Sequence, residues 1–108
     1  MRDLCVAPCG LVAALDGGQV IEISSSGETK VVAQGVRQSA MSVDFQDGVL
    51  AVGFQQSVKA FRADPDGKYA QVFEVKKTTD NVSIVKLCNS GKMLAYSTFD
   101  GKIEINNL

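Results

Sequence analysis

The residues of this chain that could do chemistry are few, because it contains no histidine. Histidine is the commonest general base and zinc ligand, so a Ser-His-Asp or Cys-His arrangement cannot be built from this sequence. The three cysteines, Cys5, Cys9 and Cys88, do not have the spacing of a zinc site, and their odd number fits reduced thiols better than a disulfide framework. We interpret them as buried small apolar residues, and we expect no catalytic residues and no metal site.

Two glycine-containing segments could be taken for ligand-binding loops, but turns explain them better. Gly17 and Gly18 precede a strand rather than a helix, so the helix N-terminus that a phosphate loop needs is missing. Asp64, Asp66 and Gly67 begin like a calcium loop, but the remaining EF-hand ligands and the terminal Glu are absent. Both segments have the composition of tight turns, and we expect no cofactor.

Length and charge limit the classes of partner. The chain has 108 residues, 45% apolar content and a formal net charge of −1, which predicts one ordinary globular domain. Acidic and basic residues nearly cancel and form no long block, so we expect neither nucleic acid nor a membrane as partner. The longest apolar run, Leu11 to Leu15, is far too short to span a bilayer, and we expect a cytoplasmic protein.

Strands are the elements that must position any functional residue. No window of a dozen residues keeps the apolar spacing of a helix. Short runs rich in Val, Ile and Phe are instead separated by Asp-Gly, Gly-Gly, Asn-Ser-Gly and Asp-Pro-Asp-Gly turns. Because the connections are so short, neighbouring strands should form antiparallel meanders. The predicted strands lie near residues 4–8, 11–15, 19–24, 29–34, 40–45, 49–53, 57–62, 69–75, 82–87, 93–97 and 102–106.

A repeat of about forty residues runs through these strands. The turn glycines Gly10, Gly48 and Gly91 mark it, and each is followed three or four residues later by an alanine. A small residue is expected there if an inner strand approaches its neighbours closely around a central axis. The alanines are Ala13, Ala51 and Ala95.

The period predicts an all-β fold, a partial β-propeller of about two and a half to three four-stranded antiparallel blades. We expect a single partial propeller over residues 1–108, with blades at approximately 3–35, 36–77 and 78–108. The last blade stops after its third strand, and a propeller needs at least about four blades to close. A fragment of a longer protein is the first explanation, and copies that complete a ring together are the second. In both cases the open blade edges favour self-association. An immunoglobulin-like sandwich is the main competing fold, and it would pair strands that are distant in sequence.

Three segments resemble known families. FDGKIEI, from Phe99 to Ile105, is similar to the Asp-Gly turn and third strand of WD-repeat proteins, although the chain has no Gly-His or Trp-Asp dipeptide. VAPCG, from Val6 to Gly10, and LAVGFQQSVKAF, from Leu50 to Phe61, resemble parts of the second propeller of the actin-interacting protein family, the two-propeller partners of cofilin. This resemblance implies a cytoskeleton-associated scaffold that binds actin and cofilin and promotes filament disassembly. It implies no bound cofactor and carries over no individual residue.

Recognition residues should lie on loops at one end of the blades, since loops on a rigid scaffold carry binding sites. Phenylalanines beside basic residues there would anchor an acidic, partly apolar partner. In the alternative interpretation, the phenylalanines pack between blades and the lysines are simply solvated. The candidate protein-binding face consists of Arg37, Gln38, Phe54, Gln55, Lys76, Lys77, Asp80, Phe99 and Asp100.

The sequence therefore predicts a non-catalytic protein-interaction scaffold, with actin and cofilin as the first choice of partner. Scaffold blades of another multiprotein assembly are an alternative. A propeller fragment that binds a peptide or a small ligand is another. An enzyme comes third among the classes, because the acid clusters that hydrolytic propellers place in a central channel are not found here.

Overall fold

The computed structural model describes residues 1–8 and 10–108, so Cys9 lies outside the described residues. Every regular element in these ranges is a strand, which confirms the all-β prediction. Within the same ranges there is no helix of the length and apolarity that crossing a membrane requires. The strands are β1 (Asp3–Ala7), β2 (Gly10–Ala14), β3 (Gln19–Ser24), β4 (Thr29–Gln34), β5 (Ala40–Gln46), β6 (Val49–Phe54), β7 (Val58–Ala63), β8 (Tyr69–Val75), β9 (Val82–Cys88), β10 (Met93–Thr98) and β11 (Ile103–Asn107).

These strands form three sheets in chain order. Sheet 1 has the order β1-β2-β3-β4, sheet 2 has β5-β6-β7-β8, and sheet 3 has β9-β10-β11. Every pairing joins strands that follow one another in the chain, and every pairing is antiparallel. An immunoglobulin-like sandwich would pair distant strands, so the pairing excludes that alternative.

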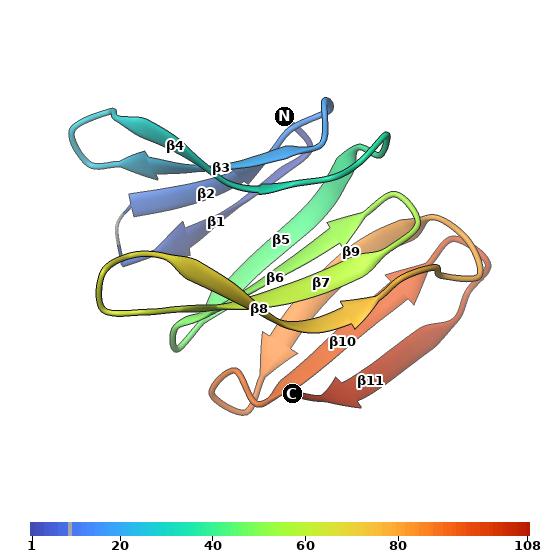
Figure 1. The fold of residues 1–108 in the computed structure, drawn as a ribbon. Helices are drawn as coiled ribbons and strands as arrows, with labels where there is room; N and C mark the ends of the chain where they lie inside the picture. The colour runs from blue at the N-terminus through green and yellow to red at the C-terminus, as the bar shows by residue number, and fades with distance from the viewer. Residues whose placement is uncertain (9) are drawn as a thin grey trace.

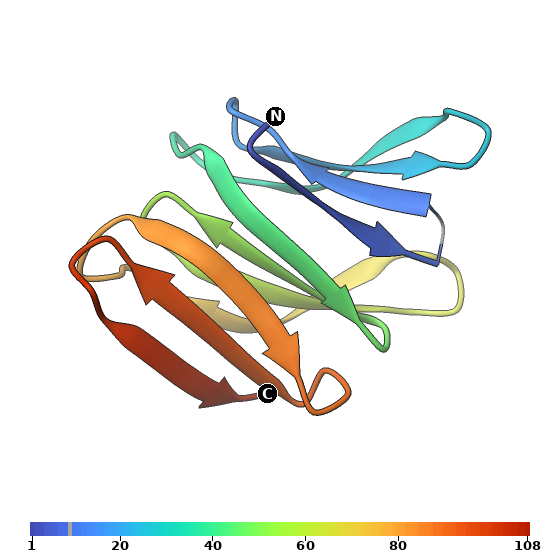
Figure 2. The same cartoon turned by 180° about the vertical axis from the view of Figure 1, so that it is seen from behind.

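The sheets stack face to face and fan out from their first strands (Figure 1). Strand β1 contacts β5, and β5 contacts β9, so the first strands lie next to one another; seen from behind, they follow each other along one side of the molecule (Figure 2). Strands β4 and β8 form the opposite, outer edges of sheets 1 and 2. In sheet 3 the outer edge is β11, because that sheet has three strands within the described chain.

Apolar side chains fill both spaces between the sheets. The layer between sheets 1 and 2 includes Val12, Val20 and Phe54, and the layer between sheets 2 and 3 includes Ala51 and Leu94. Successive residues of a strand point to opposite faces, so the central strand β6 contributes to both layers. All six of its residues are buried, which explains why the sequence VLAVGF reads as one apolar run without polar alternation.

The first strands of sheets 2 and 3 are also held by side chains of the preceding sheet. The Asp3 carboxylate of sheet 1 accepts a hydrogen bond from the Val43 backbone N–H of sheet 2, at 3.1 Å from Oδ2. The Ser42 hydroxyl of sheet 2 accepts one from the Val85 N–H of sheet 3, also at 3.1 Å. Because a first strand lies at the edge of its own sheet, these amides need an acceptor from outside it.

Two further bonds of the same kind join sheets 2 and 3. Asp44 Oδ2 accepts from the Leu87 N–H at 2.7 Å, and Gln46 Oε1 accepts from the Gly91 N–H at 2.9 Å. In each case the sheet that comes earlier in the chain supplies the side-chain acceptor, and the later sheet supplies the backbone donor. These bonds also define which residues are equivalent from sheet to sheet, with Asp3 corresponding to Ser42.

This register corrects the alignment of the three alanines. All three lie in second strands, β2, β6 and β10, rather than in the innermost ones. Ala51 faces sheet 3, and Ala95 holds the same register one sheet later. In sheet 1 that register belongs to Val12, because Val12 and Ala14 face sheet 2 and Ala13 between them points to the other face. Counting from the turn glycine therefore misplaced the first repeat by one residue.

Candidate protein-interaction surface

Four loops that carry predicted residues gather at one end of the stacked sheets, the right-hand end in Figure 1, beside the segment 15–18 that joins β2 to β3. Segments 35–39 and 76–81 each lead from a fourth strand to the next first strand, and segments 55–57 and 99–102 each join a second strand to a third. We call the surface made by these four segments the loop-end surface. Its shape is determined by hydrogen bonds between the segments.

Segment 35–39 bridges sheets 1 and 2. The Ser39 hydroxyl donates to the backbone carbonyl of Asp16 in sheet 1, at 2.7 Å. On the other side, Gln38 Oε1 accepts from the Gln56 N–H at 2.6 Å and from the Ser57 hydroxyl at 3.4 Å. The Gln38 side chain is therefore used inside the protein, as a link between two loops.

Segment 76–81 bridges sheets 2 and 3 in the same way. Thr78 N–H donates to the Gln56 carbonyl at 3.0 Å, and Phe99 N–H donates to the Asn81 carbonyl at 2.9 Å. The Thr79 hydroxyl adds a bond to Asp100 Oδ2 at 2.9 Å. Because each bridging loop is fixed at both sides, the loop-end surface is a connected framework rather than a set of independent loops.

The two predicted acidic residues organise this framework. Asp80 Oδ1 accepts from the adjacent Asn81 N–H at 2.7 Å. Asp100 accepts from the Thr98 hydroxyl through Oδ1 and from the Thr79 hydroxyl through Oδ2. The bond from Thr98, with smaller help from Thr79, lowers the pKa of Asp100 below its ordinary value, because hydrogen bonds favour the ionised carboxylate.

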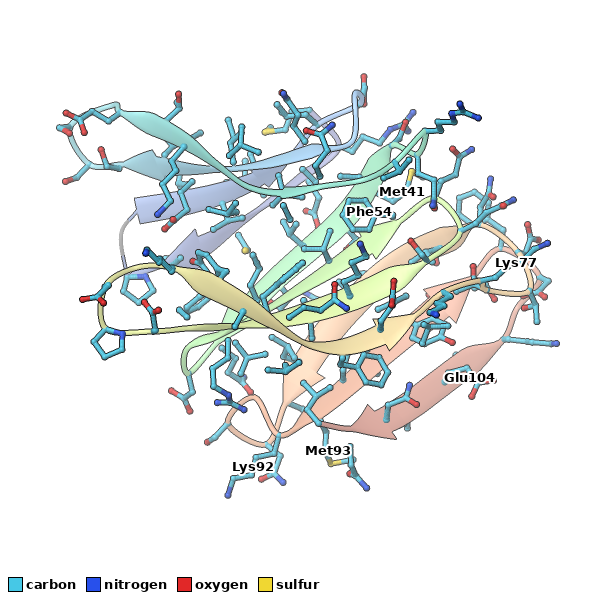
Figure 3. The ribbon with its side chains drawn as sticks, viewed as in Figure 1. Met41, Phe54, Lys77, Lys92, Met93 and Glu104 are labelled. Carbon is cyan, nitrogen blue, oxygen red and sulfur yellow. The ribbon has the colours of Figure 1, made fainter. Side chains whose placement is uncertain are left out.

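Phe54 does not belong to the surface. It is 1% exposed and lies in the apolar layer between sheets 1 and 2, where Figure 3 labels it. The Lys59 ammonium lies 5.8 Å from the centre of its ring, and a Cβ added at Gly35 would come within 2.6 Å of the ring. Phe54 was predicted to lie in a loop, but it is the last residue of β6 and its ring packs between two sheets. For this residue the packing alternative is the correct one.

Five of the predicted residues are exposed, and all but Asp100, whose carboxylate is bonded to two threonines, have side chains free of the loop-linking bonds described above. Arg37, Lys76 and Lys77 are exposed, and Phe99 is 62% exposed, which is unusual for an aromatic side chain. Figure 3 shows Lys77 at the loop end, with Lys92 at the opposite end of the sheets. The structure thus divides the predicted residues into two groups. The first group is three exposed cations and one exposed aromatic residue, and the second is the polar residues that hold the loops together.

Sequence reasoning missed Val36. It is 76% exposed and lies beside Arg37, which takes a left-handed backbone conformation with φ of 56°. The signal was present, because an apolar residue between Gly35 and Arg37 sits in a loop where no layer can bury it. Val36 and Phe99 are the exposed apolar members of the loop-end surface, and Arg37, Lys76 and Lys77 are its exposed cations. Such a set suits an acidic and partly apolar segment of a partner.

A groove lies between sheets 1 and 2 toward the other end. It consists of two adjoining hollows of about 300 and 240 Å³ that share Glu22 and Gly67. The larger hollow contains Lys30, whose ammonium donates to the Gly67 carbonyl at 2.9 Å and lies 3.7 Å from the Glu22 carboxylate. The smaller hollow has two aromatic residues, Phe45 and Tyr69, and two carboxylates, Glu22 and Asp64, in its lining.

The cysteines differ in their surroundings. Cys5 is half-buried, but Cys88 is exposed at the end of β9, so its interpretation as a buried residue was wrong. It follows Leu87, which points into the layer against sheet 2, and alternation along the strand turns Cys88 the other way. In residues 1–8 and 10–108, no three His, Cys, Asp or Glu side chains come together in a way that could hold a metal ion.

Comparison with known proteins gives no matching family model and no matching curated protein. Among solved structures, the chain is similar to Chaetomium thermophilum Sqt1, a WD-repeat protein crystallised with the N-terminus of ribosomal protein L10. The TM-score is 0.74, the sequence identity is 20%, and the similarity covers 97% of this chain and 30% of the Sqt1 chain. This chain therefore spans less than a third of the length of that protein. The fold is a partial WD-repeat β-propeller, and each sheet is one of its blades.

Proposed function

We propose that this chain is a non-catalytic scaffold that binds another protein through its loop-end surface. The observation that carries the proposal is the exposure of Phe99 and Val36 on a framework of cross-linked loops that also exposes Arg37, Lys76 and Lys77. Burying an exposed aromatic residue on a rigid surface costs little conformational entropy, which favours it as an anchor for a partner.

The fold supports the same function. Sqt1, with which the chain shares its fold, was solved with a segment of another protein bound to it. We propose that the segment recognised here is acidic and partly apolar, because the loop-end surface exposes three cations, Arg37, Lys76 and Lys77, while the Asp100 carboxylate beside Phe99 is already bonded to Thr98 and Thr79. The proposal includes actin and cofilin as the first partners to test, and their only support is the sequence resemblance of residues 6–10 and 50–61.

A variant pair tests the location of the binding surface. Proteins captured by the unmodified chain from a cell extract should be lost when Phe99→Ala is combined with Lys77→Glu. They should be retained with Lys92→Glu, a charge reversal at the opposite end. If both variants capture the same proteins as the unmodified chain, the loop-end surface is not the binding site.

Filament cosedimentation tests the actin proposal separately. The chain should pellet with cofilin-decorated actin filaments, and the Phe99→Ala, Lys77→Glu variant should stay in the supernatant. Failure of the unmodified chain to pellet would remove actin and cofilin as partners and leave the binding-surface experiment unaffected.

The groove between sheets 1 and 2 favours a second candidate function, binding of a peptide. Among the described residues, the smaller hollow is lined by Glu22 and Asp64 beside Phe45 and Tyr69, and the nearest cation to Glu22 is Lys30 of the larger hollow, 3.7 Å from its carboxylate. A lysine or arginine of an extended peptide fits this combination, through its apolar stem and its cationic head. Titration with a short lysine-rich peptide should shift the amide NMR signals of Phe45 and Tyr69, and Glu22→Gln should abolish the shifts. Glu74→Gln, on the exposed face of β8, is the matched control.

A further inference from the structure

Two sheet faces of this chain are open and apolar. The first open face is the side of sheet 1 turned away from sheet 2, and it carries Leu4, Val6, Leu11 and Val31, which are 42, 75, 36 and 51% exposed. The second open face is the side of sheet 3 turned away from sheet 2. It carries Ile84, Ile103 and Ile105, at 45, 72 and 63% exposure. Apolar patches of this extent are typical of surfaces that another protein covers.

The two open faces differ in the direction in which they pack. Each sheet has one side turned toward the sheet that follows it in the chain, the later-facing side, and one turned toward the sheet before it, the earlier-facing side. At both existing junctions, the later-facing side of one sheet packs against the earlier-facing side of the next. The second open face is a later-facing side, and the first open face is an earlier-facing side. A second copy can therefore place its sheet 1 on sheet 3 in the arrangement that sheets 1, 2 and 3 already use.

The hydrogen bonds of the first strands agree with this pairing. At the existing junctions the Val43 and Val85 amides take acceptors from Asp3 and Ser42 of the preceding sheet. The equivalent amide of sheet 1 belongs to Leu4, and it already donates to the Oδ1 of Asp3, its own neighbour, at 2.9 Å. Sheet 1 thus needs no acceptor at this position from a sheet placed before it.

Sheet 3 offers no side-chain acceptor at the position equivalent to Asp3 of sheet 1 and Ser42 of sheet 2. There Ile84 replaces Asp3 and Ser42, and Lys86 replaces Asp44. A sheet with a first-strand amide in need of an acceptor would lose a hydrogen bond on this face, at a cost of about 1–3 kcal/mol per buried amide. The first open face avoids this cost at the Leu4 amide, because Asp3 satisfies that amide from within the strand.

The shape of the second open face gives a place for an apolar side chain. A hollow of about 200 Å³ lies there, between Ile84, Ala95 and Ile103, with the stem of Lys86 at its side. Filling such a hollow with a branched apolar residue removes apolar surface from water on both partners. Val6 and Leu11 of a second copy lie directly opposite each other in the β1–β2 pair and supply such residues.

We propose that the second open face of one copy binds the first open face of a second copy, head to tail. The contact is heterologous, so the pair keeps one open face of each kind and further copies can add. Because the sheets fan out from their first strands, successive contacts of this kind turn about the same axis and close into a ring (Figure 2).

Mass measurements on the full chain test the proposal. By light scattering or sedimentation velocity, the unmodified chain should have a mass that is a multiple of 11.5 kDa and increases with concentration. Ile105→Lys and Val6→Lys should each reduce it to the mass of one chain at the same concentration. Val72→Lys, a matched change at a 47% exposed position on β8, should leave the mass of the assembly unchanged. A single-chain mass for the unmodified protein at every concentration overturns the proposal.

A mixing experiment separates head-to-tail association from contact between like faces. The Ile105→Lys variant keeps a working first open face, and the Val6→Lys variant keeps a working second one. Equal amounts of the two should form a complex of two chains and nothing larger. A complex made by the Val6→Lys variant alone would show that sheet 3 binds sheet 3, and no complex in the mixture would show that the faces do not fit. Circular dichroism of each variant confirms that it is folded.

Discussion

The carboxylate of Asp44 in sheet 2 accepts a 2.7 Å hydrogen bond from the backbone N–H of Leu87, on the first strand of sheet 3. These two residues are far apart in the sequence and belong to different sheets. Apolar packing between sheets has little directional preference, whereas this bond has one defined geometry. It therefore contributes to the register of sheet 3 against sheet 2 as well as to stability.

Replacement of Asp44 by Ala should lower the free energy of unfolding by about 1–3 kcal/mol, because it leaves the partly buried Leu87 amide without its acceptor. Urea denaturation followed by circular dichroism measures the change. Glu74→Ala, an exposed acidic position on β8, should change stability by less than about 0.5 kcal/mol. Equal effects of the two substitutions would contradict the assigned role of Asp44.

A methyl group at Gly53 should be destabilising, because the sheets approach closely there. A Cβ at this position would lie 2.7 Å from the Val82 Cγ1 and 2.9 Å from the Val85 Cγ1 of sheet 3. Gly53→Ala should therefore cost about 1–3 kcal/mol through overpacking. Gly17→Ala, where nothing lies within 4 Å of the added Cβ, is the control. Combination with Val82→Ala should cost less than the sum of the two single changes, and additive costs would contradict the contact.

The two phenylalanines of the predicted surface should respond in opposite ways. Phe54→Ala removes a ring that is 1% exposed and should cost about 3–5 kcal/mol of stability. Phe99→Ala removes a ring that is 62% exposed and should leave the melting temperature nearly unchanged. Thermal unfolding of both variants measures this difference. A large loss of stability from Phe99→Ala would mean that its ring packs against the loops, and it would no longer suit a partner anchor.

The pKa of Asp100 should lie below its ordinary value of 3.8, because the Thr98 hydroxyl, and then the Thr79 hydroxyl, donate to the ionised carboxylate. A group with a lowered folded-state pKa contributes its stabilisation above its unfolded value and loses it as pH falls through the folded one. The contact between segments 76–81 and 99–102 should therefore persist through the mildly acidic range and weaken only in strong acid. Carboxyl-carbon NMR titration measures the pKa. Thr98→Val should raise it more than Thr79→Val does, and the reverse order would contradict the assignment.

Most of the strands were predictable from the sequence, because turn residues and β-branched runs mark them locally. The run from Val49 to Gly53, for example, was predicted as a strand and β6 extends it by one residue, to Phe54. This difference of one residue explains why Phe54 was wrongly predicted to lie in a loop of the loop-end surface. A strand end and the first loop residue look alike in a sequence, and only the neighbouring sheet determines that the Phe54 ring is buried.

The register between sheets was not predictable in the same way. Spacing from a turn glycine counts residues along the chain, but Gly10 is itself the first residue of β2 whereas Gly48 precedes β6, so the same count reaches different faces. Ala13 and Ala51 stand at the same distance from their glycines and yet point to opposite sides of their sheets. The acceptors Asp3, Ser42 and Asp44 carry the missing information, but they look like ordinary polar strand residues until the amides that they meet are known.

The links between first strands have a consequence for how such a protein changes over evolutionary time. The bond is given by a backbone N–H, which every residue except proline carries, so the receiving strand is free to vary its side chains. The only sequence requirement falls on a short polar residue in the neighbouring blade. Duplicated blades can accordingly drift until hardly any identity remains between them, and they still fit side by side.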